Sequence, residues 1–114
     1  MRVLIAFENE YRVYGEVIAR VIRELRPSVE VTVAEAETVG EEVGRLLPEL
    51  VISSRAKAIG AAHKAAWVEF ALEHGRTSRI CVGGRCSESQ VLSFKELLSV
   101  VDETQRLSGT GRDP

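Results

Sequence analysis

Three polar clusters, each directly after an apolar run, are the residues best suited to chemistry: Glu8-Asn9, Ser53-Ser54-Arg55 and Gly83-Gly84-Arg85. If the apolar runs are strands that end at one sheet edge, that edge gathers hydroxyls, glycine amides and guanidiniums, which suit a phosphate or carboxylate. We therefore predict an anion site there, although neither G-x-x-x-x-G-K-[ST] nor G-x-G-x-x-G is present. The alternative is structural: the serines cap the next segment, the glycines form a turn and the arginines are solvated.

The soft metal ligands of the sequence are two cysteines and two histidines: Cys81, Cys86, His63 and His74. The C-x4-C spacing is not that of a zinc knuckle or ribbon, so no metal site is predicted. Because two cysteines are too few for a disulfide framework, we expect reduced thiols, with Cys81 as a small buried apolar residue. A nucleophilic Cys86 with a histidine base is the alternative, but no helix N-terminus or fixed basic partner is predicted beside its thiol.

The aromatic residues Tyr11, Tyr14 and Trp67 are the candidates for a partner surface, because aromatic side chains concentrate at protein interfaces. Packing is the alternative, in which Trp67 covers the sheet and the two tyrosines cover the first helix.

Hydrophobic periodicity predicts alternating strands and helices in the first half of the chain. Residues 2–7 and 49–53 are continuous apolar runs, typical of strands that helices cover on both faces, whereas 29–35 alternates as a half-exposed strand does. Helical spacing from Tyr14 to Leu25 lies between the first two strands, and a T-x-x-E capping box at Thr38 opens a second helix. This pattern predicts an α/β fold with a doubly wound sheet in the order 2-1-3.

The second half is predicted less directly. Residues 55–74 fit one Ala-rich helix, or a short helix near 56–65 followed by a hairpin of "AWVEFALE" with "RICVGG", and we favour the hairpin. A second capping box, at Ser93, opens the last helix. We expect one domain over 1–107 and a flexible tail over 108–114.

Composition narrows the classes of function. The 114 residues suit one domain, and Lys+Arg 15 against Asp+Glu 17 gives a net charge of −2, with no basic field for nucleic acid or an anionic membrane. No apolar run reaches the roughly 20 residues of a membrane span, and the start does not resemble a signal peptide, so a cytoplasmic protein is expected. The only aspartates are Asp102 and Asp113.

The order "RVLIAFEN", "VEVTVAEA", "PELVISS" and "SFKELLSVV" resembles the receiver domain of bacterial response regulators, a flavodoxin-like fold, over residues 1–103. In receivers, acids ending strand 1 hold Mg²⁺, an aspartate ending strand 3 takes the phosphoryl group, and a lysine before the last helix reads the new charge. The corresponding positions here are Phe7, Glu8, Ser54 and Gln90. Because acylphosphate chemistry needs a carboxylate nucleophile beside a metal, the resemblance implies a degenerate, stand-alone receiver.

Two functions follow as expectations. The leading one is a non-catalytic pseudo-receiver in signal transduction, with no cofactor, that acts through contacts with a protein partner or as a homodimer. The alternative is a protein or enzyme that binds a small anionic ligand at the strand-end edge through Ser54, Arg55 and Arg85.

Overall fold

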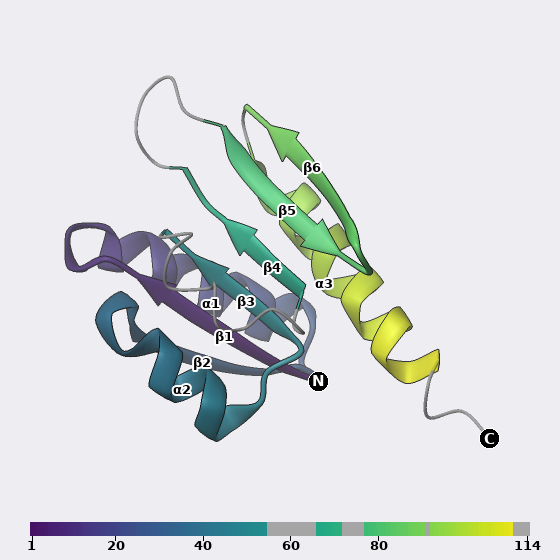
Figure 1. Ribbon diagram of the computed structural model, residues 1–114, viewed down its shortest axis with the longest axis horizontal. Coiled ribbons are helices and arrows are strands. Elements are labelled where there is room, and N and C mark those ends of the chain that lie inside the picture. Colours follow the sequence, from purple (N-terminus) through teal and green to yellow (C-terminus); the bar gives the residue numbers. More distant parts are fainter. Residues whose placement is uncertain (55–65, 72–76, 91, 111–114) are drawn as a thin grey trace.

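The computed structural model contains a six-stranded mixed sheet and three α-helices, which confirms the predicted α/β class (Figure 1). It describes residues 1–54, 66–71, 77–90 and 92–110. The strands are β1 (Arg2–Phe7), β2 (Glu30–Glu35), β3 (Leu50–Ser53), β4 (Ala66–Glu69), β5 (Ser78–Val82) and β6 (Arg85–Ser89). The helices are α1 (Arg12–Leu25), α2 (Val39–Leu46) and α3 (Phe94–Thr110), with single 3₁₀ turns at Asn9–Tyr11 and Ala36–Thr38.

The strands lie in the order β2-β1-β3-β4-β5-β6. Strands β2, β1, β3 and β4 are parallel, with Ile5 of β1 opposite Ile52 of β3, whereas β5 and β6 each run antiparallel to the preceding strand. In Figure 1 the arrow of β5 accordingly points opposite to those of β1 and β4. The carboxyl ends of β1 to β4 therefore lie together at one end of the strands, the carboxyl edge of the sheet. The turn between β5 and β6 lies at the opposite end of the strands.

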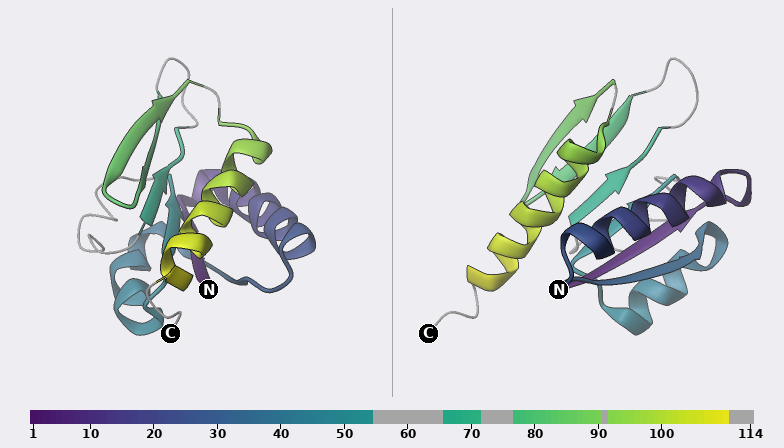
Figure 2. Two further views of the ribbon diagram at one scale, coloured as in Figure 1. Left: turned by 90° about the vertical axis from the view of Figure 1, so that its right-hand side faces the viewer. Right: turned by 180° about the vertical axis from the view of Figure 1, so that it is seen from behind.

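Helices cover both faces of the parallel part of the sheet. Figure 2 shows α1 and α3 on one face and α2 on the other. The larger apolar cluster lies under α1 and α3 and includes Ile5, Ile22 and Leu97, and the smaller one lies under α2 and includes Leu4 and Val39. Burial on both faces explains why the sequences of β1 and β3 are continuously apolar.

The predicted hairpin is present as β4 and β5, while the helix predicted near 56–65 lies outside the described residues. A second hairpin, β5–β6, was not predicted. Gly83 and Gly84 connect its strands with φ of 59° and 81°, so both turn residues adopt the left-handed conformation that two-residue hairpins favour. Strand β6 has the sequence RCSES, and none of its residues is fully buried. Its sequence therefore does not show the alternation of apolar and polar residues that predicts a strand.

Only one of the two predicted capping boxes forms. Ser93 accepts a hydrogen bond from the Glu96 amide at 3.2 Å, as its capping box predicts, but the hydroxyl of Thr38 donates to the Glu35 carbonyl and does not cap α2. Helix α3 extends through Thr110. Within the described part of the chain, no helix combines the length and apolar character needed to cross a membrane.

Candidate functional site

The carboxyl edge of β1 and β3 carries the positions expected to do chemistry. At this edge the hydroxyl of Ser54 accepts a hydrogen bond from the backbone N–H of Glu8 at 2.8 Å, and the Ser54 amide is 3.4 Å from the Ala6 carbonyl oxygen. The neighbouring Ser53 is completely buried. The Ser54 hydroxyl therefore joins the end of β3 to the end of β1, in the place where a receiver would present its acceptor.

Phe7, at the first acidic position of the receiver pattern, fills the same edge from the side of α1. Its side chain is 4% exposed and belongs to the larger apolar cluster, and its ring centroid is 5.9 Å from that of Phe70, which follows β4. A hard cation needs oxygen ligands and water, so a buried aromatic ring at this position disfavours a hydrated metal.

The structure does not bring together the predicted anion-binding residues. Gly83, Gly84 and Arg85 lie at the opposite edge of the sheet from Ser53 and Ser54, because β5 runs antiparallel to β4. This corrects the expectation that the ends of all these strands converge, because the second strand of the β4–β5 hairpin ends at the edge where β4 begins. Arg55 lies outside the described residues, as do His63 and His74.

Gln90, at the receiver's lysine position, is also far from Ser54. It follows β6, which lies three strands from β3 in the sheet order. With neighbouring strands about 4.8 Å apart, this separation amounts to about 14 Å. A side chain there is too distant to read a charge at Ser54.

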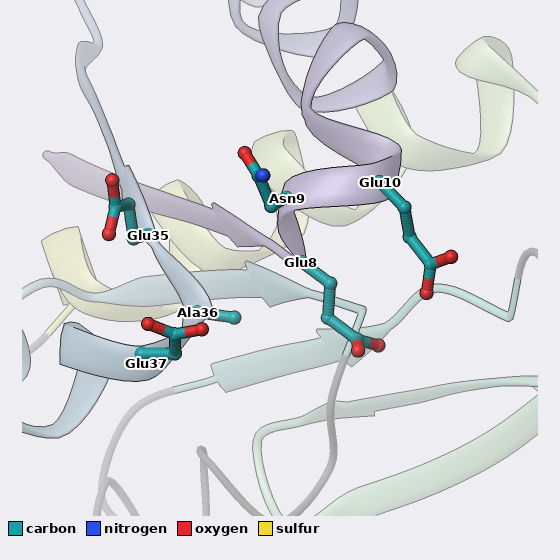
Figure 3. Close-up of a pocket in the computed structure, with 6 residues that line it drawn as sticks. All are labelled: Glu8, Asn9, Glu10, Glu35, Ala36 and Glu37. Atoms are coloured by element: carbon teal, nitrogen blue, oxygen red, sulfur yellow. The ribbon is translucent and has the colours of Figure 1, made fainter.

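A shallow, acidic pocket of about 510 Å³ opens beside this edge, between the turns that follow β1 and β2 (Figure 3). Its lining consists of Glu8, Asn9, Glu10, Glu35, Ala36 and Glu37. In Figure 3 the four carboxylates spread around the pocket and do not meet at one point. Among the described residues no group of His, Cys, Asp or Glu is arranged to hold a metal. The negative charge of this lining disfavours an anionic ligand nearby.

The three aromatic candidates for an interface have different surroundings. Tyr11 is half-buried against the larger cluster, and Trp67 is half-buried against the smaller one, with the guanidinium of Arg79 5.8 Å from its ring centroid. Tyr14 is 57% exposed. Packing therefore accounts for Tyr11 and Trp67, and only Tyr14 lies largely at the surface.

Two valines beside Tyr14 extend its exposed surface on α1. Val13 is 69% and Val17 is 44% exposed, one helical turn apart. The sequence indicates this exposed apolar surface, because the apolar residues of α1 cover more of the helix circumference than one buried stripe needs. Val13 lies outside that stripe and was missed as a surface residue.

The cysteines form a disulfide, so the expectation of reduced thiols is wrong for this structure. Cys81 of β5 is directly opposite Cys86 of β6 in the antiparallel register. The sequence contained this signal as well, since two cysteines that flank a two-residue Gly-Gly turn at C-x4-C spacing face each other across a hairpin. Cys81 is 7% exposed, whereas Cys86 is an exposed residue.

No protein-family model, no curated protein and no solved structure matches this chain. No relative therefore supplies a role for any of these residues.

Proposed function

We propose that the chain is a non-catalytic, receiver-like regulatory module that acts through protein contacts. The observation that carries this proposal is the 2.8 Å hydrogen bond from the Glu8 amide to the Ser54 hydroxyl, beside the buried ring of Phe7. The acceptor position of a receiver is here part of the backbone framework, and the first of its metal-binding positions is the apolar Phe7. Phosphoryl transfer to this edge would need a carboxylate nucleophile and a bound metal.

The flavodoxin-like assignment belongs to the same proposal. It is supported by the parallel neighbours β2, β1 and β3, with α1 and α2 on opposite faces of the sheet. Doubly wound sheets with these connections place their ligand side at the carboxyl ends of the strands. The antiparallel β5 and β6 depart from a receiver, whose sheet is parallel throughout.

The alternative, a binder of small anions through Ser54, Arg55 and Arg85, is less well supported. Arg85 lies at the far edge of the sheet, and the pocket that opens beside the carboxyl edge has four glutamates in its lining. An anion at the carboxyl edge would meet their negative charge.

We assign the partner contact to the exposed face of α1 formed by Val13, Tyr14 and Val17. Two ion pairs of the same helix adjoin this face: Arg12 and Glu16 are 3.8 Å apart beside it, and Arg20 and Glu24, 3.2 Å apart, follow it toward the C-terminal end of α1. An apolar, aromatic centre with a charged rim is the usual composition of a protein interface. A tyrosine at such a centre can carry much of the binding energy.

The absence of phosphoryl chemistry is tested with Mg²⁺ and acetyl phosphate, followed by intact-mass and peptide mass spectrometry. We expect no phosphoryl adduct on the chain and the same result for Ser54→Ala. An adduct that maps to Ser54 and disappears in Ser54→Ala would overturn the proposal. Beryllofluoride with Mg²⁺ is the second probe, and it is expected to leave the melting temperature unchanged.

The contact face is tested by placing a photo-crosslinking amino acid at position 14 and, as a control, at position 41 of α2, on the opposite face of the sheet. Glu41 is an exposed residue, so both positions reach solvent. Irradiation of cells is expected to give a discrete crosslinked product from position 14 only, and its mass distinguishes a second copy of the chain from another protein. No discrete product from position 14, or the same product from both positions, would contradict the assignment.

A further inference from the structure

The Cys81–Cys86 disulfide lies on the side of the sheet formed by β6, the last strand in the sheet order. It joins β5 to the edge strand β6, one residue pair away from the Gly83-Gly84 turn. The two cysteines are separated by only 5 positions in the sequence. Because a disulfide restricts the unfolded chain more when it closes a longer loop, this bond adds little restriction beyond that of the turn.

The two cysteine residues differ in their exposure to solvent. Cys86 is exposed on the edge strand, whereas Cys81 is 7% exposed on β5. Attack on a disulfide requires that the incoming thiolate reach one sulfur, with the other sulfur leaving. The exposed Cys86 is therefore the sulfur open to attack, and Cys81 is the leaving group.

Charged neighbours lie on the same face of the hairpin. Arg79 precedes Cys81 by two positions on β5 and is directly opposite Glu88 of β6, while its guanidinium stacks over Trp67, which pairs with Cys81 from β4. A cation close to a cysteine favours its thiolate, and Glu88 acts in the opposite direction. The stacking on Trp67 keeps the guanidinium on the face of the sheet that Cys81 shares, and Cys81 Sγ is the sulfur that must leave as an anion.

We propose that Cys81–Cys86 is a thiol–disulfide exchange site, at which Cys86 reacts reversibly with a low-molecular-weight thiol. The thiolate sulfur bonds to Cys86 Sγ while the Sγ–Sγ bond breaks, and the electron pair leaves with Cys81 Sγ. A second thiolate then attacks the small-molecule sulfur of this mixed disulfide and releases Cys86 as a thiolate. Two small thiols are thereby oxidised to one small disulfide, and the protein disulfide is reduced to two thiols.

Reduction is expected to leave the fold intact. The Gly83-Gly84 turn, the ladder between β5 and β6 and the apolar clusters under the helices do not depend on the Sγ–Sγ bond. The exchange therefore proceeds in the folded protein, at the surface of the edge strand.

The test equilibrates the full chain in buffers of glutathione and glutathione disulfide, with alkylation of free thiols and intact-mass analysis. We expect reversible passage between the disulfide and the dithiol, and a reduced protein that still unfolds in one cooperative thermal transition. A disulfide that is reduced only when denaturant unfolds the protein, or a dithiol that does not close again, would overturn the proposal.

Two single variants identify the sulfur that is attacked. Cys81→Ser leaves Cys86 without its partner and is expected to form the mixed disulfide with glutathione disulfide rapidly. Cys86→Ser, which retains only the buried Cys81, should react on the order of tenfold more slowly, because access and thiolate character set the rate. Equal rates for the two variants would mean that both sulfurs react through unfolded chains, which contradicts exchange at an exposed Cys86.

Discussion

Strands β3 and β6 belong to one sheet but are stabilised in different ways. All residues of β3 are buried, because helices cover the parallel part of the sheet on both faces, whereas no residue of β6 is fully buried. Burial of apolar side chains stabilises the first region, and a glycine turn, a backbone ladder and a disulfide hold the second. The disulfide therefore lies in the region where the core contributes least.

The largest expected effect comes from truncating a core side chain in β3. Ile52 is completely buried, so Ile52→Ala should lower the free energy of unfolding by about 2–5 kcal/mol. Ile80 on β5 is only half-buried, and Ile80→Ala should cost less than half as much as Ile52→Ala. Chemical denaturation monitored by circular dichroism measures both, with Ile52→Val as the conservative control, at about 0.5–1.5 kcal/mol. Equal costs at the two positions would remove the distinction between the regions.

Removing a serine hydroxyl should also have different effects in the two regions. Ser54→Ala leaves the half-buried Glu8 amide without its acceptor and is expected to cost about 1–3 kcal/mol. Ser87 is exposed on β6, so Ser87→Ala should stay within about 0.5 kcal/mol of the wild type. The same denaturation experiment compares the pair. A Ser54→Ala variant as stable as Ser87→Ala would show that the hydroxyl has no framework role.

Burial also determines what could be predicted from sequence. Strands β1 and β3 leave continuous apolar runs, and the β4–β5 hairpin leaves alternation at Val68, so these elements were predicted. Strand β6 buries no apolar face and was missed. The antiparallel direction of β5 follows from the predicted hairpin, yet Arg85 was assigned to the wrong edge, because the second strand of a hairpin ends where the first begins.

The candidate site depended on tertiary partners that no local pattern encodes. The sequence identified Phe7 and Ser54 as departures from the receiver pattern, but it did not indicate that the Ser54 hydroxyl binds the Glu8 amide, since the two residues are 46 positions apart. The disulfide, by contrast, could have been predicted from the sequence of the turn. A two-residue hairpin turn at Gly83-Gly84 places Cys81 opposite Cys86.

A smaller effect is expected at the hairpin turn, where the two glycines form a matched pair. Both have positive φ, so Gly84→Ala should cost about 1–2 kcal/mol from backbone strain alone. A Cβ at Gly83 would in addition approach Leu107 Cδ1 of α3 to 2.9 Å, while a Cβ at Gly84 meets open space. Gly83→Ala should therefore lower the melting temperature more than Gly84→Ala does. In a Leu107→Ala background the two variants should become equal, and a difference that persists there would rule out this contact as its cause.

The smallest expected effect concerns the exposed ion pair between Arg26, at the end of α1, and Asp102 of α3. Arg26 donates two hydrogen bonds to Asp102, at 2.6 and 2.8 Å, which lower the pKa of the carboxyl and raise the pKa of the guanidinium. A depressed carboxyl pKa contributes stability above the unfolded value of about 3.9, and this stability is lost as the pH falls through the folded pKa. The raised pKa of Arg26 has no effect in this window, because the guanidinium stays charged throughout it.

Asp102→Asn should therefore lower the melting temperature slightly at neutral pH and leave it unchanged at about pH 2, where the wild-type carboxyl is protonated as well. The loss at neutral pH should shrink in high salt, because solvent and counterions screen an exposed pair. Thermal melts of both proteins across this pH range measure the difference. Since the pair joins two helices that already pack on the same face of the sheet, a large loss at neutral pH would mean that α3 depends on this ion pair more than on its apolar face.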